Sequence, residues 1–265
     1  MPAKKKQSLK GRSVVVTRAA DQSAPLVELL KAEGADVIEL PLIQTSREPV
    51  NEAIEGAFRE LWSYEWLIFT SPNGVRYFFE HFFAAFDDIR ALGGARIAAI
   101  GRATLDALHA LHLRTDVVPE VYTSEALAGA LVSEQTLDNL NILIVAGNLN
   151  GDGLKDSLEK ASAIVDSVSF YRTEHTDLSQ HPNTARFRRD GADAIVFASG
   201  SAVESFVSQA KVLKTEPNAL RPIACSIGPV TAEAMKKRGL PVDVVADEAS
   251  AGSIVDALAK HFSKA

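Results

Sequence analysis

The chain has 265 residues, of which 46% are hydrophobic and 23% are charged, a composition typical of globular proteins and too apolar for a disordered chain. This length allows one large domain or two smaller ones, since a domain averages roughly 150 residues. The formal charge of -6 argues against the broad basic surface that nucleic-acid binding needs, so nucleic acid is not an expected partner.

The chain begins with a short lysine run that leads into no apolar stretch of the secretory type. We therefore expect residues 1–11 to form a disordered tail and the protein to be cytoplasmic. No run approaches the roughly 18 consecutive apolar residues of a membrane span, so no membrane partner is expected. The lone cysteine, Cys225, lies in an apolar run and is expected to be a buried structural thiol.

Short apolar runs alternate with stretches of helical periodicity along the whole chain. Such runs are typical of parallel strands that are covered on both faces, so the pattern predicts an α/β fold. The predicted strands are 14–16, 66–69, 97–100, 142–145, 194–197, 223–227 and 242–245. Helical periodicity is clearest over 24–33, 75–85, 104–113, 154–160 and 231–238.

An internal repeat divides the sequence into two similar halves. Phe69–Val75 matches Phe197–Val203 at an offset of 128, and Ile100–Thr104 matches Ile227–Thr231 at 127. A third match, at 127, aligns residues 34–39 with residues 161–166. Three matches at nearly one spacing predict two copies of one unit.

Two segments are longer than ordinary strands, and they occupy equivalent positions in the two repeats. They are residues 36–48, which contain Pro41, and residues 163–174. We interpret them as the chain leaving one domain and returning to it. The predicted fold is thus two similar parallel-sheet α/β domains joined by a two-stranded linker, one inserted into the other. The outer domain comprises 1–40 and 172–265, the inserted domain 46–167, and the linkers 41–45 and 168–171.

Strand-to-helix turns in this sequence are rich in glycine and small hydroxyl residues. In parallel sheets such turns lie at the carboxyl ends of the strands, where helix N-termini present free N–H groups to anions. Any single hydroxyl here has the alternative role of an ordinary helix N-cap. The turns are Thr17–Arg18, Thr70–Asn73, Gly101–Thr104, Gly147–Asn148, Ser199–Ser201 and Gly228–Thr231.

The common nucleotide, zinc and acyl-enzyme motifs are missing from the sequence. His109 and His112 have a spacing that could hold a metal, but no third ligand is evident, and we assign them a structural or surface role. The Asp87–Asp88 pair is expected in a solvated turn. Tyr171 lies in the second long segment, where it could donate a proton in a cleft or simply pack.

These turns together resemble the uroporphyrinogen-III synthase family from about Val14 to Leu258. The residues that carry the resemblance are Trp66-Leu-Ile-Phe-Thr-Ser-Pro-Asn-Gly-Val75, Ala99-Ile-Gly-Arg-Ala-Thr104, Gly147-Asn-Leu-Asn150, Val168-Ser-Phe-Tyr-Arg-Thr173, Ser226-Ile-Gly-Pro-Val-Thr231 and Gly239-Leu-Pro-Val-Asp-Val-Val-Ala246.

The resemblance implies a reaction without cofactor or metal. Hydroxymethylbilane, a linear tetrapyrrole with eight carboxylates, loses water and closes to uroporphyrinogen III, the last ring being inverted through a spiro intermediate. Tyr171 would be the general acid. The residues implied to bind substrate are Arg18, Ser71, Asn73, Gly101, Thr104, Asn148, Ser199, Ser201, Gly228 and Thr231.

Two turns depart from the family pattern. The second hydroxyl turn reads Phe-Ala-Ser-Gly-Ser201, and Val145-Ala-Gly147 lacks the arginine that bacterial members often place before the glycine. The alternative to the enzyme is therefore a non-catalytic, two-domain module that binds a small anionic molecule. For the enzyme we expect a monomer and a transient contact with hydroxymethylbilane synthase, which would supply the substrate.

Overall fold

The computed structural model describes residues 7–263. The chain forms two compact units: unit 1 comprises the chain up to Gln44 and from Glu174 onward, and unit 2 comprises Thr45–Thr173. Within the described residues, helices of the length and apolarity required to cross a membrane are absent.

Unit 1 is built on a five-stranded sheet of order β10-β9-β8-β1-β2. All four pairings in this sheet are parallel, as the continuous apolar runs predicted. The strands are β1 (Ser13–Val16), β2 (Asp36–Glu39), β8 (Ala194–Phe197), β9 (Ile223–Ser226) and β10 (Val244–Val245).

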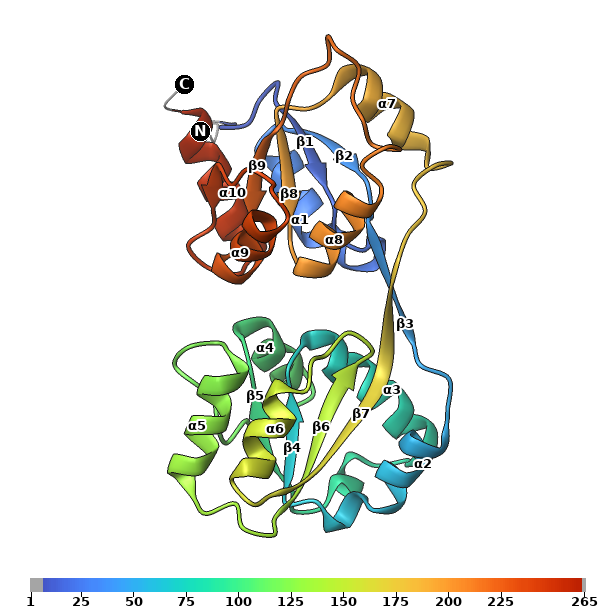
Figure 1. Ribbon diagram of the computed structural model, residues 1–265, viewed down its shortest axis with the longest axis vertical. Helices are drawn as coiled ribbons and strands as arrows, with labels where there is room; N and C mark the ends of the chain where they lie inside the picture. The colour runs from blue at the N-terminus through green and yellow to red at the C-terminus, as the bar shows by residue number, and fades with distance from the viewer. Residues whose placement is uncertain (1–6, 264–265) are drawn as a thin grey trace, which may run out of the picture. The chain divides into compact units, whose positions relative to one another are not determined.

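Helices cover both faces of this sheet (Figure 1). On one face lie α1 (Ala20–Ala32) and α10 (Ala251–Phe262), and on the other α7 (Pro182–Asp190), α8 (Gly200–Ser208) and α9 (Pro229–Lys237). Side chains of alternate strand residues pack into the two layers, so the three central strands β9, β8 and β1 are almost fully buried.

Unit 2 has a second five-stranded sheet, of order β3-β7-β6-β4-β5. One face carries α5 (Ser124–Glu134) and α6 (Gly153–Lys160), and the other α2 (Glu52–Arg59), α3 (Pro72–Ala85) and α4 (Arg102–Ala110). Two short 3-10 helices are η1 (Leu61–Ser63) and η2 (Ile89–Leu92). The strands are β3 (Ile43–Arg47), β4 (Trp66–Phe69), β5 (Arg96–Ala99), β6 (Asn141–Gly147) and β7 (Ile164–His175).

The two long segments differ in how they fold. Residues 36–48 break into β2 and β3 around Pro41, whereas β7 runs without interruption for 12 residues. Proline lacks the N–H that a ladder needs, which accounts for the break. The chain passes from unit 1 to unit 2 within β3 and returns within β7, and these strands are neighbours in the second sheet.

Strand registers show that the two units repeat one architecture. Val14 pairs with Val37 in unit 1, and Ile142 pairs with Val165 in unit 2, 128 positions later in both strands. The parallel pair Cys225–Val244 likewise follows Ala98–Val117 by 127 positions. Each unit is therefore completed by strands from both sequence repeats.

The register corrects one alignment made from the sequence. Residues 34–39 were matched to 161–166 at an offset of 127, but the registers make Val165 the equivalent of Val37, an offset of 128. Gly34 then aligns with Ser162, and both have positive φ, 85° and 65°. A one-residue slip would turn every strand side chain to the opposite face, so the structural offset is the physical one.

The predicted tail is shorter than expected. Residues 7–11 are ordered, and Leu9 is fully buried in the core beneath α1 and α10. The Leu9 N–H donates to the Glu33 carbonyl at 2.9 Å, which fixes this segment to the end of α1. The expectation of disorder was wrong for residues 7–11, because a single buried leucine anchors them. Residues 1–6 lie outside the described part.

Three smaller predictions are confirmed. Cys225 is fully buried, and burial raises its pKa to about 12. His109 and His112 are exposed, as expected for a surface role. Asp88 lies in a solvated turn, where its exposed carboxylate pairs with Arg90 at 2.5 Å.

Candidate functional site

Tyr171 lies at the carboxyl edge of the second sheet and is buried, with 7% of its surface exposed. Its ring stacks on that of Tyr77 from α3, with 5.7 Å between centroids and 19° between planes. Its hydroxyl lies 3.0 Å from Ser71 Oγ. Burial raises the pKa of Tyr171, and the hydrogen bond with Ser71 only partly offsets this. The phenol therefore stays protonated at neutral pH and is placed to donate a proton.

A β-bulge directs the Tyr171 side chain. Ala146 pairs with Ser169 and Gly147 with Tyr171, so Phe170 is an extra residue in β7. Successive strand residues normally point to opposite faces, yet Phe170 and Tyr171 both pack in the core beneath α3. Bulges of this kind re-aim side chains and are frequent beside active sites.

Gly147 makes room for the Tyr171 ring. A Cβ atom at this position would lie 2.4 Å from Tyr171 Cζ, a distance that real Cβ contacts do not reach. The next residue, Asn148, holds the same strand, since its Oδ1 accepts from Thr173 N at 2.7 Å and its backbone N–H donates to the Tyr171 carbonyl. The Gly-Asn turn thus fixes the position of the tyrosine.

Ser71 has two roles at the start of α3. As the N-cap it accepts from Gly74 N at 2.9 Å, and it is also the partner of the Tyr171 hydroxyl. Ser199, its counterpart in unit 1, caps α8 by accepting from Ala202 N at 3.2 Å. Its second contact is with Ser201 Oγ at 3.0 Å.

We expect Ser71→Ala to destabilise the protein more than Ser199→Ala. Each change removes an N-cap worth about 1 kcal/mol, but only Ser71→Ala also strips the partner from a buried phenol, which costs about 1 kcal/mol more. Urea unfolding measures both losses, with a Ser71→Ala/Tyr171→Phe double variant to isolate the shared contact. Equal losses for the two serines would contradict the coupling.

The remaining predicted residues of unit 2 lie on two turns. Asn73 is in the first turn of α3. Gly101 is the N-cap of α4, with φ 88°, and has no side chain to satisfy the free N–H groups there. Thr104, in the same turn, is 1% exposed, and its N–H donates to the Gly101 carbonyl at 3.1 Å. Gly101 therefore leaves a helix N-terminus open to an anion.

Unit 1 presents the other five predicted residues at its own carboxyl edge. Gly228 caps α9 without a side chain, and Thr231 in the first turn is 5% exposed. Arg18 follows β1 and is partly buried. Burial lowers its pKa and Asp21 raises it. Ser199 and Ser201 form one hydroxyl pair. The predicted residues thus divide between the two units, five in unit 1 and six in unit 2.

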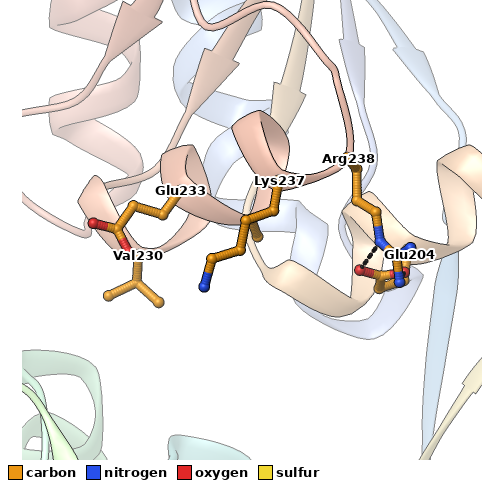
Figure 2. A pocket seen from close by; sticks show the side chains of 6 residues that line it. Glu204, Val230, Glu233, Lys237 and Arg238 are labelled. Atoms are coloured by element: carbon orange, nitrogen blue, oxygen red, sulfur yellow. Dashed lines mark hydrogen bonds and ion pairs between the residues drawn. The ribbon is translucent and has the colours of Figure 1, made fainter.

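Each unit contains a surface pocket. The larger, of about 510 Å³, lies between α8 and α9 in unit 1 and is lined by Glu204, Val230, Glu233, Ala234, Lys237 and Arg238. Figure 2 shows Arg238 turned to Glu204, and its Nε lies 2.6 Å from Glu204 Oε1. With two glutamates and one of its two cations already paired, this pocket is poorly suited to a polyanion. The smaller, of about 250 Å³, is in unit 2.

The chain resembles known proteins over most of its length. The family described as Uroporphyrinogen-III synthase HemD matches residues 24–256. The chain belongs to the uroporphyrinogen-III synthase family. This membership confirms the predicted family and favours the enzyme over the non-catalytic binding module.

Individual members support the assignment over most of the chain. The porphyrin biosynthesis protein HemD of Ruminiclostridium josui is 30% identical over 96% of this chain, which spans about half (49%) of that longer relative. The uroporphyrinogen-III synthase of Synechococcus elongatus is 29% identical over 76% of this chain and 75% of its own. A mutant uroporphyrinogen III synthase from Thermus thermophilus has the same fold, with a TM-score of 0.67 at 19% identity over 96% of this chain and 100% of its own.

Two features of the arrangement around Tyr171 were missed from the sequence. Tyr77 was read only as part of a helical pattern, although its place on the sheet-facing side of α3 could have indicated a contact with strand residues. The close approach of Gly147 to Tyr171 depends on the bulge in β7 and left no signal beyond the glycine itself.

Proposed function

We propose that this chain is a uroporphyrinogen-III synthase that cyclises hydroxymethylbilane with loss of water and inversion of the terminal pyrrole ring. The observation that carries the proposal is the Tyr171–Ser71 pair, a protonated, buried phenol held by hydrogen bonding and stacking at the carboxyl edge of a parallel sheet. This edge is where ligands bind in open α/β sheets.

Proton donation is the role of Tyr171 in this scheme. The terminal hydroxyl of the bilane leaves as water once it receives the phenolic proton, and the cationic carbon that remains is attacked by the substituted end of the last ring. This attack gives a spiro intermediate, in which the bond from the attacking ring carbon to its original methylene bridge then breaks. The freed bridge carbon, now cationic, bonds to the unsubstituted end of the same ring, and that ring carbon loses its proton, which restores the phenol. Ser71, whose oxygen lies 3.0 Å away, orients the phenol and stabilises the phenolate by donating to it.

Substrate carboxylates are the proposed ligands of the glycine and hydroxyl turns. In unit 2 these are Ser71, Asn73, Gly101, Thr104 and Asn148. In unit 1 they are Arg18, Ser199, Ser201, Gly228 and Thr231. Helix N-termini without a side-chain cap, at Gly101 and Gly228, support this role because their free N–H groups and the helix dipole favour negative charge.

The proposal includes the organisation expected from the sequence. The sequence placed the outer domain at 1–40 and 172–265 and the inserted domain at 46–167, with linkers at 41–45 and 168–171. Because residues 168–171 pair with β6 inside unit 2, we propose that the hinge lies instead at the crossings Gln44–Thr45 and Thr173–Glu174. Support comes from the chain crossing between compact units within β3 and β7. We further propose a monomer that receives the unstable bilane by transient contact with hydroxymethylbilane synthase.

The decisive experiment is product analysis. The purified protein is incubated with freshly prepared hydroxymethylbilane, and the products are separated after oxidation to porphyrins. We expect isomer III to predominate, whereas buffer alone gives isomer I by unaided closure. Formation of isomer I alone by the folded protein would overturn the proposal. Tight binding of an anionic tetrapyrrole without isomer III would then favour the binding module.

A further inference from the structure

A polar pocket of about 250 Å³ in unit 2 has no role in the scheme above. It is lined by Ile144 and by the polar residues Thr70, Ser124, Asn150, Lys155 and Ser167. Ile144 packs in the core beneath α5 and α6, whereas Tyr171 packs in the core beneath α3. The pocket therefore opens on the other face of the sheet from the tyrosine.

The lining offers one cation and several neutral hydrogen-bond donors. Asn150 Nδ2 donates to Thr70 Oγ1 at 3.2 Å, which ties the loop after β6 to the loop after β4. The Nζ atom of Lys155 lies 3.8 Å from Glu159 Oε1, which is a long contact for an ion pair. Among the described residues no carboxylate lines the pocket, although α6 carries acidic residues elsewhere. This donor set suits an anion.

The equivalent positions of unit 1 show that the fold does not require these residues. By the strand registers and the core leucines of the helices, Lys155 corresponds to Val27, Thr70 to Ala198 and Ser124 to Ala251. Ser167 corresponds to Glu39, whose carboxylate accepts from Ser23 Oγ at 2.7 Å. At these four positions the same architecture thus folds with apolar or acidic residues, so the fold does not require the cation and the three hydroxyls of unit 2.

We infer that this pocket binds one carboxylate side chain of the substrate, an inference that rests on the proposed function. The volume is below the roughly 300–1,000 Å³ of pockets that hold whole drug-sized ligands, so it fits a carboxyalkyl arm rather than a tetrapyrrole. Leu149, which precedes the lining residue Asn150, and Tyr122, two positions before Ser124, are 59% and 47% exposed. They provide apolar surface for the pyrrole ring that bears the arm.

The test replaces Lys155 by methionine, which keeps the length of the side chain and removes its charge. Lys160→Met, at the exposed end of the same helix and outside the pocket, is the matched control. We expect Lys155→Met to raise the KM for hydroxymethylbilane about fivefold with kcat nearly unchanged, as for an interaction made equally in ground and transition states. Lys155→Arg, which keeps the positive charge, should have a KM close to that of the wild type.

A binding titration separates this inference from the proposed function. Uroporphyrin III, the stable octacarboxylate, is titrated into the full-length protein, and Lys155→Met should weaken binding about fivefold relative to Lys160→Met. Equal affinities and equal KM values for the two variants would overturn the inference even when the wild type forms isomer III. Absence of isomer III with the wild type would overturn the proposed function, and the titration would still report on the pocket.

Discussion

Tyr171→Phe is expected to lower the rate of isomer III formation by about 100-fold or more, the lower range for removal of a general acid. The substitution deletes only the phenolic oxygen, so the ring keeps its stacking on Tyr77. Ser71 also keeps its cap on α3 through Gly74 N. Because the bilane closes unaided without inversion, the products should shift toward isomer I as the catalysed rate falls.

Tyr77→Phe is the matched control for this result. Tyr77 is the stacking partner of Tyr171, but its own hydroxyl donates to the Thr45 carbonyl at 3.0 Å. Removing that hydroxyl should cost about 1 kcal/mol of stability and change the rate by only a few-fold. Equal rates for the two phenylalanine variants would assign Tyr171 to packing alone.

The pH dependence follows from the raised pKa of Tyr171. A general acid acts in its protonated form, and burial extends that form to pH values above the ordinary tyrosine pKa of about 10. We expect no loss of isomer III formation from this group through neutral and mildly alkaline pH, and a loss only above about pH 10. Single-turnover rates, corrected for unaided closure, measure this loss of activity at high pH. If the loss is absent in Tyr171→Phe, Tyr171 is the group that titrates.

The sequence was sufficient for the α/β fold because its strands are short runs buried on both faces. Trp66–Phe69 is buried at all four positions, and a continuous apolar run of this kind does not fit a strand with one face in solvent. The strand bounds in segment 36–48 were harder to predict, since two short strands with a proline between them give the same extended pattern as one long strand.

The site was predictable where it depends on local turn chemistry. Ser71 and Ser199 were recognised as hydroxyls that open helices, and both are N-caps. The packing of Tyr171 could not be predicted, because an extra residue in β7 reverses the normal alternation and turns the ring toward α3. The pocket at Lys155 could not be predicted either, because its lining comes from the loops after β4 and β6 and from the starts of two helices.

Gly147→Ala is expected to abolish most isomer III formation by displacing Tyr171. The added Cβ would lie 2.4 Å from Cζ and 2.6 Å from Cε2 of the ring, so the ring must leave its place against Tyr77 and Ser71. Overpacking of this kind costs about 1–3 kcal/mol, and the rate should fall at least as far as in Tyr171→Phe. Urea unfolding and the product assay measure the two effects.

Gly56→Ala controls for the general effect of replacing glycine. Gly56 lies inside α2 with no atom within 4 Å of a built Cβ, so alanine there should stabilise the protein by about 0.5–1 kcal/mol and leave activity intact. Clash with the ring is then isolated by repeating Gly147→Ala in a Tyr171→Leu background. In that background the loss of stability caused by Gly147→Ala should be smaller, because the ring atoms that the alanine Cβ would contact are absent. An undiminished cost would place the strain in the backbone of the β6 turn and not in the contact with Tyr171.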